Sequence, residues 1–448
     1  MSVLKLAVWS DDARVGEIGF DAEADLWSLE YDAKWVASDD SFPLSPRLPL
    51  NLAAGETYGS QTIRRLLQNL LPEGQILDDV ARANGVGKGN VFALIHALGS
   101  ETTGAFRFLP VDADGLDQPE QPPREVTLAE LDSKVKARNW EPFAKWDGHV
   151  RMSIAGQQDK IALYVEWDQE GRISRMLLPD APYASTHLVK PEPTSDALPH
   201  LVANEHFCMS LAKKLGFPVA NVEILRLPAP ALMIERFDRL QQAPSDRVRR
   251  LHIIDACQAL DMPVTAKYEK SMGNLAEYRE GVSLPKLFSI IDLVPAKAKA
   301  TLGMLRWVLF QLLISNFDAH GKNFSFLVGR NHLELAPWYD LVCVAAYPAL
   351  SQEYAMAFGD TFAQSELTPY EFGHFAALCK LPTSVVRKEA SKLAKTASAV
   401  TFQLAEDGPY EGEEKEFVQQ LAQYIAKQAT WLAELASNLS KTRLSDYE

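Results

Sequence analysis

The chain has 448 residues, which is too many for one ordinary hydrophobic core and predicts two or three domains. Hydrophobic residues make up 47% and charged residues 23%, the proportions of a globular protein that is soluble in water. The formal charge of -14, from 59 acidic and 45 basic residues, argues against a surface built mainly to bind nucleic-acid phosphates, although a local basic patch is compatible with it.

No segment of the sequence predicts export or a membrane span. The opening residues MSVLKLAVWSDD lack the long apolar core and cleavage site of a secretory signal. The longest apolar run, LGMLRWVLFQLLIS, is too short to cross a bilayer and contains Arg306 and Gln311. The four cysteines are far apart and show neither metal-site nor disulfide spacing. We therefore expect no membrane partner and a cytoplasmic location.

The first part of the chain, residues 1–110, is expected to form a small N-terminal α+β domain. Short alternating runs predict strands at residues 3–9 and 27–31. Helical periodicity predicts helices at residues 60–71 and 75–85.

An acidic, proline-rich segment follows, and it predicts a linker at residues 111–125 because it cannot bury enough apolar surface to fold. Residues 126–250 are then expected to form a sheet-rich, nucleotide-binding lobe, an antiparallel sheet with one helix at 197–216 that is closed by Gly216. The strands are predicted at residues 151–156, 160–167, 174–179, 185–193, 219–227 and 231–239.

The remaining residues, 251–448, are expected to form a helical catalytic lobe. Almost all of it has helical periodicity, apart from a polar loop and a strand pair near residues 324–328 and 333–340. The last long stretch carries one apolar stripe, for which core packing is favoured over a membrane-surface or partner-binding face. The stripe consists of Phe417, Leu421, Tyr424, Ile425, Trp431, Leu432, Leu435 and Leu439.

The polar loop lies within residues 312–327, between two apolar runs, and suggests phosphoryl transfer. That reaction needs a carboxylate near the attacking hydroxyl and further groups that hold Mg²⁺. Asp318 and Asn323 have the spacing of the catalytic base and metal-binding amide in a protein-kinase catalytic loop, and Asp340 follows a short hairpin, where kinases place a metal-binding carboxylate. The alternative is that these side chains only cap helices or fix turns.

Upstream residues could supply the other parts of a kinase site. The loop at residues 153–160 has one glycine, Gly156, where backbone could approach a phosphate, but a plain hairpin explains it as well. Lys190 ends a predicted strand and could bind phosphate, or it could be a solvated strand-end lysine. Glu205 could pair with Lys190, or it could interact favourably with the helix dipole.

Taken together, the motifs resemble one family, the HipA-type toxin serine/threonine kinases. The resemblance extends to about Tyr347 and includes FPLSPRLPL, LLPEG and GSETTGAFRF in the amino-terminal part. Its most specific parts are SIAGQQDK and NFDAHGKN, and it also includes THLVKPEP, NEHFCMSLAKKLG, IERFDR, DACQALDMPVTAKYE and PWYDLV.

The resemblance implies a two-lobed protein-kinase-like fold that uses ATP and Mg²⁺. It implies that Asp318 is the catalytic base, that Asn323 and Asp340 hold Mg²⁺, and that Lys190 contacts the phosphates of ATP. The remaining implied nucleotide contacts are a phosphate-binding loop (Ser153, Ile154, Ala155 and Gly156), a hinge segment at adenine (Glu235 and Phe237) and two further neighbours, Gln258 and His320.

The family resemblance also implies a biological role. Members are toxins of a bacterial toxin–antitoxin pair, and they halt growth by phosphorylating an aminoacyl-tRNA synthetase, often the glutamyl enzyme. Ser153 matches a serine that such kinases phosphorylate on themselves, which silences ATP binding. A small DNA-binding, HipB-like antitoxin would link the acidic chain to DNA, so that DNA is contacted only indirectly.

Two other functions fit the same residues. One is a small-molecule or lipid kinase, because the same carboxylates and amide serve any hydroxyl acceptor. The other is a pseudokinase that binds nucleotide and acts with its antitoxin as a corepressor.

Overall fold

The structure, a computed structural model, describes most of the chain and divides into two compact units. The described residues are 3–112, 124–138, 140, 143, 145–147, 149–150, 158–179, 183–241, 248–271 and 278–439. Unit 1 comprises residues 1–191, 225–254 and 326–333, and unit 2 comprises residues 192–224, 255–325 and 334–448.

Unit 1 begins with a four-stranded antiparallel sheet and four helices. The strands have the order β3-β2-β1-β4, and their bounds are β1 (Leu4–Ser10), β2 (Ala13–Asp21), β3 (Leu26–Tyr31) and β4 (Phe106–Pro110). The helices are α1 (Ala33–Ala37), α2 (Ser60–Leu70), α3 (Gly74–Ala83) and α4 (Val91–Leu98). Strand β3 alternates as predicted, since Trp27 and Leu29 are buried on the face that packs with Ile63 and Leu67 of α2. The predicted strands and helices of this α+β part are confirmed.

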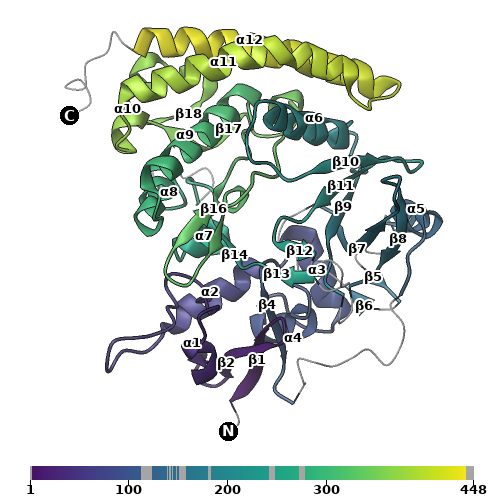
Figure 1. The fold of residues 1–448 in the computed structure, drawn as a ribbon, viewed down its shortest axis with the longest axis vertical. Coiled ribbons are helices and arrows are strands. Elements are labelled where there is room, and N and C mark those ends of the chain that lie inside the picture. Colours follow the sequence, from purple (N-terminus) through teal and green to yellow (C-terminus); the bar gives the residue numbers. More distant parts are fainter. Residues whose placement is uncertain are drawn as a thin grey trace. The chain divides into compact units, whose positions relative to one another are not determined.

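Unit 1 contains a second sheet (Figure 1). Its buried side chains form a hydrophobic core of their own. Its strands in this unit run β11-β9-β7-β8 and pair antiparallel, as the alternating sequence predicts. Their bounds are β7 (Ile161–Trp167), β8 (Ile173–Leu177), β9 (His187–Pro191) and β11 (Ala231–Glu235). The remaining elements of unit 1 include helix α5 (Leu128–Ala137) and two separate strand pairs, β5 (Lys145–Trp146) with β6 (His149–Val150) and β12 (Arg239–Gln241) with β13 (Val248–Arg250).

The chain passes between the two units at the end of β9 and within four further strands. These four are β10 (Val222–Leu225), β14 (Ile253–Asp255), β15 (Ser325–Val328) and β16 (Leu333–Leu335). The predicted strand pair around residues 324–328 and 333–340 corresponds to β15 and β16.

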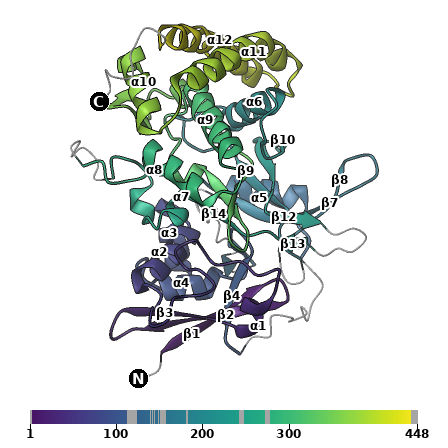
Figure 2. The ribbon, with the colours of Figure 1, turned by 60° about the vertical axis from the view of Figure 1, so that its left-hand side comes forward.

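Unit 2 is mostly helical. Its helices are α6 (Leu201–Lys214), α7 (Ala256–Ala259), α8 (Leu284–Ser289), α9 (Lys297–Ile314), α10 (Pro369–Leu378), α11 (Thr383–Asp407) and α12 (Glu413–Asn438). The two long helices α11 and α12 run side by side and contact α6 and α9 (Figures 1 and 2). In the apolar stripe, Leu421, Ile425 and Leu432 are buried, so core packing is confirmed as its role.

Two secondary-structure predictions need correction. Helix α6 begins at Leu201 rather than near residue 197, because Pro199 restricts the preceding residue and His200 is left-handed, with a φ of 56°. The region after Leu251 also contains an unpredicted hairpin, β17 (Glu353–Phe358) and β18 (Thr361–Ala363). Strand β17 is buried on both faces, so its sequence shows no period of two.

Other predictions concern the membrane, the cysteines and the segments outside the described residues. Among the described residues, no helix is both long and apolar enough to cross a membrane. All four cysteines are buried thiols of unit 2, which confirms that they form no disulfide. The predicted linker lies largely outside the described residues, and the predicted strand at 151–156 does so entirely.

Candidate active site

The polar loop begins where helix α9 ends, in unit 2. Ser315 closes the helix in the left-handed conformation, with a φ of 48°, and turns the chain out of the apolar core. The buried side chain of Asn316 then ties the loop to its surroundings. Its Nδ2 donates to Gln311 Oε1 at 2.9 Å, and its Oδ1 accepts from the Asp318 backbone N–H at 3.2 Å. The apolar run is therefore interrupted by a turn that the side-chain amide of Asn316 stabilises.

The structure brings Asp318, Asn323 and Asp340 together. Asn323 Nδ2 donates to the Asp318 carbonyl oxygen at 3.2 Å and to Asp340 Oδ2 at 3.1 Å. A 3₁₀ turn at Gly321–Asn323 carries the amide, and the backbone N–H of Asn323 donates to His320 O at 2.9 Å. One amide thus connects the two aspartates, which are 22 positions apart in the chain.

The two aspartates differ in environment. Asp318 is exposed, so an acceptor in solvent can approach it, and its Oδ1 accepts a hydrogen bond of 2.5 Å from the Tyr268 hydroxyl. Asp340 is partly buried and has a φ of 57°, a left-handed conformation that aspartate tolerates better than most residues. Its carbonyl oxygen accepts from Asn316 Nδ2 at 3.4 Å. Strained backbone of this kind is concentrated at functional sites, where surrounding contacts maintain it.

A neutral histidine, His320, and a buried ion pair between Lys322 and Asp255 stabilise the loop that carries Asp318. Burial and the positive charge of Lys267 lower the pKa of His320 to about 3, so its imidazole is neutral at pH 7. His320 Nδ1 accepts from the Lys322 backbone N–H at 3.3 Å, and Lys322 Nζ donates to Asp255 Oδ2 at 2.7 Å. Lys322 and Asp255 are both buried, so they form a shielded ion pair.

Asp255 also begins helix α7 through a capping box with Gln258. Asp255 Oδ1 accepts from the Gln258 backbone N–H at 2.8 Å, and Gln258 Oε1 accepts from the Asp255 backbone N–H at 3.1 Å. No role was predicted from the sequence for Asp255, Lys322 or Tyr268. The D-x-x-Q spacing of a capping box was a usable signal for Asp255, but nothing local marks its pairing with Lys322, which is 67 positions away.

The other predicted residues lie in unit 1 or outside the described part. Lys190 lies in β9 opposite Leu232 of β11 and is only 6% exposed, unlike a solvated strand-end lysine. Glu235 ends β11 and is exposed, and Phe237 follows it, partly buried. Ser153, Ile154, Ala155 and Gly156 lie outside the described residues.

A buried ion network in unit 1 surrounds the segment that carries Glu235 and Phe237. Glu101 accepts from Arg236 and Arg239 at 3.0 Å each and from Arg250 at 2.7 Å. Asp238 accepts from Arg236 and Arg239 at 2.7 and 2.8 Å. Burial and the neighbouring Arg236 lower the pKa of Arg239 to about 10. The network ties residue 101, before β4, to the segment after β11.

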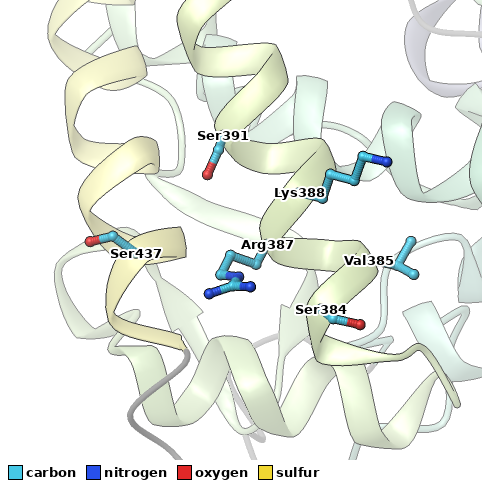
Figure 3. Close-up of a pocket in the computed structure, with 6 residues that line it drawn as sticks. All are labelled: Ser384, Val385, Arg387, Lys388, Ser391 and Ser437. Carbon is cyan, nitrogen blue, oxygen red and sulfur yellow. The ribbon is translucent and has the colours of Figure 1, made fainter.

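A pocket on the two long helices of unit 2 is separate from this set of residues (Figure 3). Its lining consists of Ser384, Val385, Arg387, Lys388 and Ser391 of α11 and Ser437 of α12. None of the predicted site residues lines it.

An aspartate that solvent can reach lies in a loop whose asparagine bonds both to that aspartate's backbone and to the carboxylate of a second aspartate, and this order of Asp, Asn and Asp is that of a protein-kinase-type phosphotransferase. Comparison with known proteins identifies the family. The model of the HipA N-terminal domain matches residues 6–109, and that of the HipA-like C-terminal domain matches residues 152–401. The chain belongs to the HipA family of serine/threonine-protein kinase toxins.

Two relatives illustrate the match. The serine/threonine-protein kinase toxin HipA of Shewanella oneidensis is 39% identical over 400 residues, which cover 88% of this chain and 87% of that protein. A solved complex of HipA, HipB and operator DNA from Shewanella oneidensis MR-1 contains a chain that is 35% identical, with a TM-score of 0.86 and coverage of 98% of this chain and 100% of that one. The predicted two-lobed protein-kinase-like α+β fold, with a small N-terminal α+β domain and a mostly helical C-terminal lobe, is confirmed.

Proposed function

We propose that the chain transfers the γ-phosphate of ATP to a serine or threonine hydroxyl of a protein, with Asp318 as the catalytic base. The observation that carries this proposal is the single amide of Asn323, which bonds to both Asp318 and Asp340. The bond to Asp318 alone could fix a turn, but the bond to the Asp340 carboxylate, 17 positions away, is one that a residue which only fixes a turn does not need.

The proposed step is an in-line transfer. A carboxylate oxygen of Asp318 takes the proton of the acceptor hydroxyl, whose oxygen then bonds to the γ-phosphorus. The bond between the γ-phosphorus and the β–γ bridging oxygen breaks, and ADP leaves with that electron pair. The exposure of Asp318 suits this role because the acceptor must reach it from solvent.

Asn323 and Asp340 fit Mg²⁺, which prefers oxygen ligands and is commonly held by one or two carboxylates together with substrate phosphates. The two hydrogen bonds of the Asn323 side chain use its amide nitrogen, so neither of them consumes the amide oxygen. When bound, Mg²⁺ would neutralise charge on the β- and γ-phosphates.

We assign the nucleotide contacts that the family resemblance implies. Lys190 would contact the phosphates, Glu235 and Phe237 the adenine, and Gln258 and His320 would lie near the nucleotide. The neutral state of His320 supports its assignment, because a neutral imidazole can donate or accept a hydrogen bond without adding charge. The loop formed by Ser153, Ile154, Ala155 and Gly156 would cover the phosphates, with Ser153 also serving as the acceptor for autophosphorylation.

The same proposal extends to substrate and partner. An aminoacyl-tRNA synthetase, with the glutamyl enzyme favoured, would be the protein substrate, and its phosphorylation would arrest growth. A HipB-like antitoxin would supply the DNA-binding surface, which is consistent with the net charge of -14 on this chain. DNA would then be contacted only through that partner.

Phosphate transfer from labelled ATP, measured with Mg²⁺ after phosphatase treatment, tests the proposal. We expect label on Ser153 and on glutamyl-tRNA synthetase, mapped by mass spectrometry. Asp318→Ala should lower transfer by at least about 100-fold, the usual effect of removing a general base. Asp292→Ala is the matched control, because Asp292 is 83% exposed and belongs to the same unit.

Other outcomes identify the alternative functions. Label that goes to sugars, inositol lipids or aminoglycosides, with none on proteins, would indicate a small-molecule or lipid kinase. ATP binding without transfer, by wild type and Asp318→Ala alike, would indicate a nucleotide-binding corepressor.

A further inference from the structure

We propose that Tyr268 is a positioning residue for the catalytic base, and the proposal rests on the function assigned to Asp318 above. The Tyr268 hydroxyl would hold one carboxylate oxygen of Asp318, so that the carboxylate meets the acceptor hydroxyl in a single orientation. Tyr268 itself would contact neither ATP nor the acceptor.

The contact is short and of a strong type. Tyr268 OH donates to Asp318 Oδ1 at 2.5 Å, within the range of hydroxyl bonds to an ionised carboxylate. The Asp318 backbone is held separately, by Asn316 at its N–H and by Asn323 at its carbonyl oxygen. Fixed backbone still leaves two side-chain torsions of an aspartate to be set. The Tyr268 bond restrains them.

The Tyr268 ring is held in place by residues of the same site. It packs edge-on against His320, with centroids 5.0 Å apart and an interplanar angle of 89°. The Lys267 ammonium lies 5.3 Å from the ring centroid, a cation–π arrangement. His320 and Lys267 are both buried, at 6–7% exposure, so the tyrosine ring packs against side chains that are themselves fixed in the core.

The backbone around Tyr268 is locked to the loop that carries Asp318. A Cβ atom at Gly281 would lie 1.7 Å from the Tyr268 carbonyl oxygen, so the two backbones are in direct contact there. A Cβ at Gly321, within the loop, would lie 2.7 Å from Val282. In addition, the backbone N–H of Gly321 donates to the carbonyl oxygen of Lys267, the residue before Tyr268, at 2.9 Å. Tyr268 and Asp318 thus belong to one packed body.

This packing favours a fixed support over a gate. A phenol that blocked the acceptor would have to swing aside in each catalytic cycle, and it would then lose its ring contacts with His320 and Lys267. The two roles predict opposite signs for removal of the hydroxyl. A support makes the variant slower, whereas a gate makes it faster.

Tyr268→Phe tests the proposal because phenylalanine keeps the ring contacts and removes only the donor. We expect kcat for transfer to a protein acceptor to fall by about 10- to 100-fold, the effect of losing a hydrogen bond to a charged group. The KM for ATP should stay unchanged. Tyr278→Phe, in the same unit and 51% exposed, is the matched control.

The variants should be combined with Asp318→Ala in a double-mutant cycle. If Tyr268 acts through Asp318, adding Tyr268→Phe to Asp318→Ala should lower the residual transfer no further. Additive losses, a kcat within twofold of wild type, or faster transfer by Tyr268→Phe would each overturn the positioning role. If wild type is active and Asp318→Ala is not, Asp318 remains the catalytic base even when the positioning role of Tyr268 is refuted. An inactive wild type would refute both the kinase function and the role of Tyr268.

Discussion

The buried network at Glu101 allows a stability prediction that is independent of catalysis. Glu101→Gln keeps the shape of the side chain and removes its charge. The carboxylate accepts hydrogen bonds from Ser185 and from three arginines, and its side chain is only 10% exposed. The arginines drive the pKa of Glu101 far below its usual range, although burial alone would raise it. The substitution therefore leaves buried positive charge without its main partner.

The size of the effect follows from which partners remain. Arg236 and Arg239 keep Asp238, so only Arg250 loses its carboxylate contact in this network outright. Breaking a buried ion pair costs about 3–5 kcal/mol, and because Asp238 is retained we expect a loss of about 3 kcal/mol here. For a unit of this size, each kcal/mol shifts the melting temperature by about 2–4 °C, so we expect a loss of about 6–12 °C.

Differential scanning calorimetry at pH 7 provides the assay, with Glu170→Gln as the control. Glu170 also pairs with an arginine but is 64% exposed, so its loss should change little. The pKa of Glu101 is lower in the folded protein than in the unfolded chain, where it is about 4.3. The ionised carboxylate therefore adds to the free energy of unfolding above that pH, and this contribution is lost as the pH falls below it. The difference between wild type and Glu101→Gln should therefore shrink in acid. A shift below about 2 °C at pH 7 would refute this account of the network.

Two further predictions concern pH and packing. Burial lowers the pKa of His252 to about 4, and its Nε2 donates to Leu44 O at 2.9 Å. Because the folded protein resists protonation of His252, the free energy of unfolding should fall by about 3 kcal/mol as the pH drops from about 6.5 to about 4. In calorimetry, the melting temperature of His252→Gln should depend less on pH over that range. Gly281→Ala, with its Cβ 1.7 Å from Tyr268 O, should lower both melting temperature and kinase activity, whereas Gly87→Ala, which meets open space, should leave both unchanged. An active, stable Gly281→Ala would contradict the packing described at Tyr268.

The sequence predicted the parts of the site whose signal is local. Asp318 and Asn323 lie in one short loop, so their spacing alone suggested shared chemistry, and Asp340 follows the next hairpin. Strands β7 and β9 and the long helices were likewise marked by apolar periodicity.

The parts that sequence reasoning missed depend on contacts between distant residues. Tyr268 reaches Asp318 from 50 positions away, through close backbone packing at Gly281 that leaves no periodic pattern. Hairpin β17–β18 is buried on both faces at β17, so its apolar run resembles a helix segment. The arginines around Glu101 come from more than 130 positions away, and nothing in the local sequence distinguishes them from surface arginines.

The placement of the cysteines provides a chemical probe of one unit alone. Cys208, Cys257, Cys343 and Cys379 are the four cysteines of the chain, and all belong to unit 2. Burial raises the pKa of Cys343 to about 12 and that of Cys208 well above its usual value, which suppresses the reactive thiolate. Alkylation by a maleimide should therefore follow the opening of unit 2 while unit 1 contributes no signal, so labelling rates with and without ATP would report how nucleotide stabilises the helical unit.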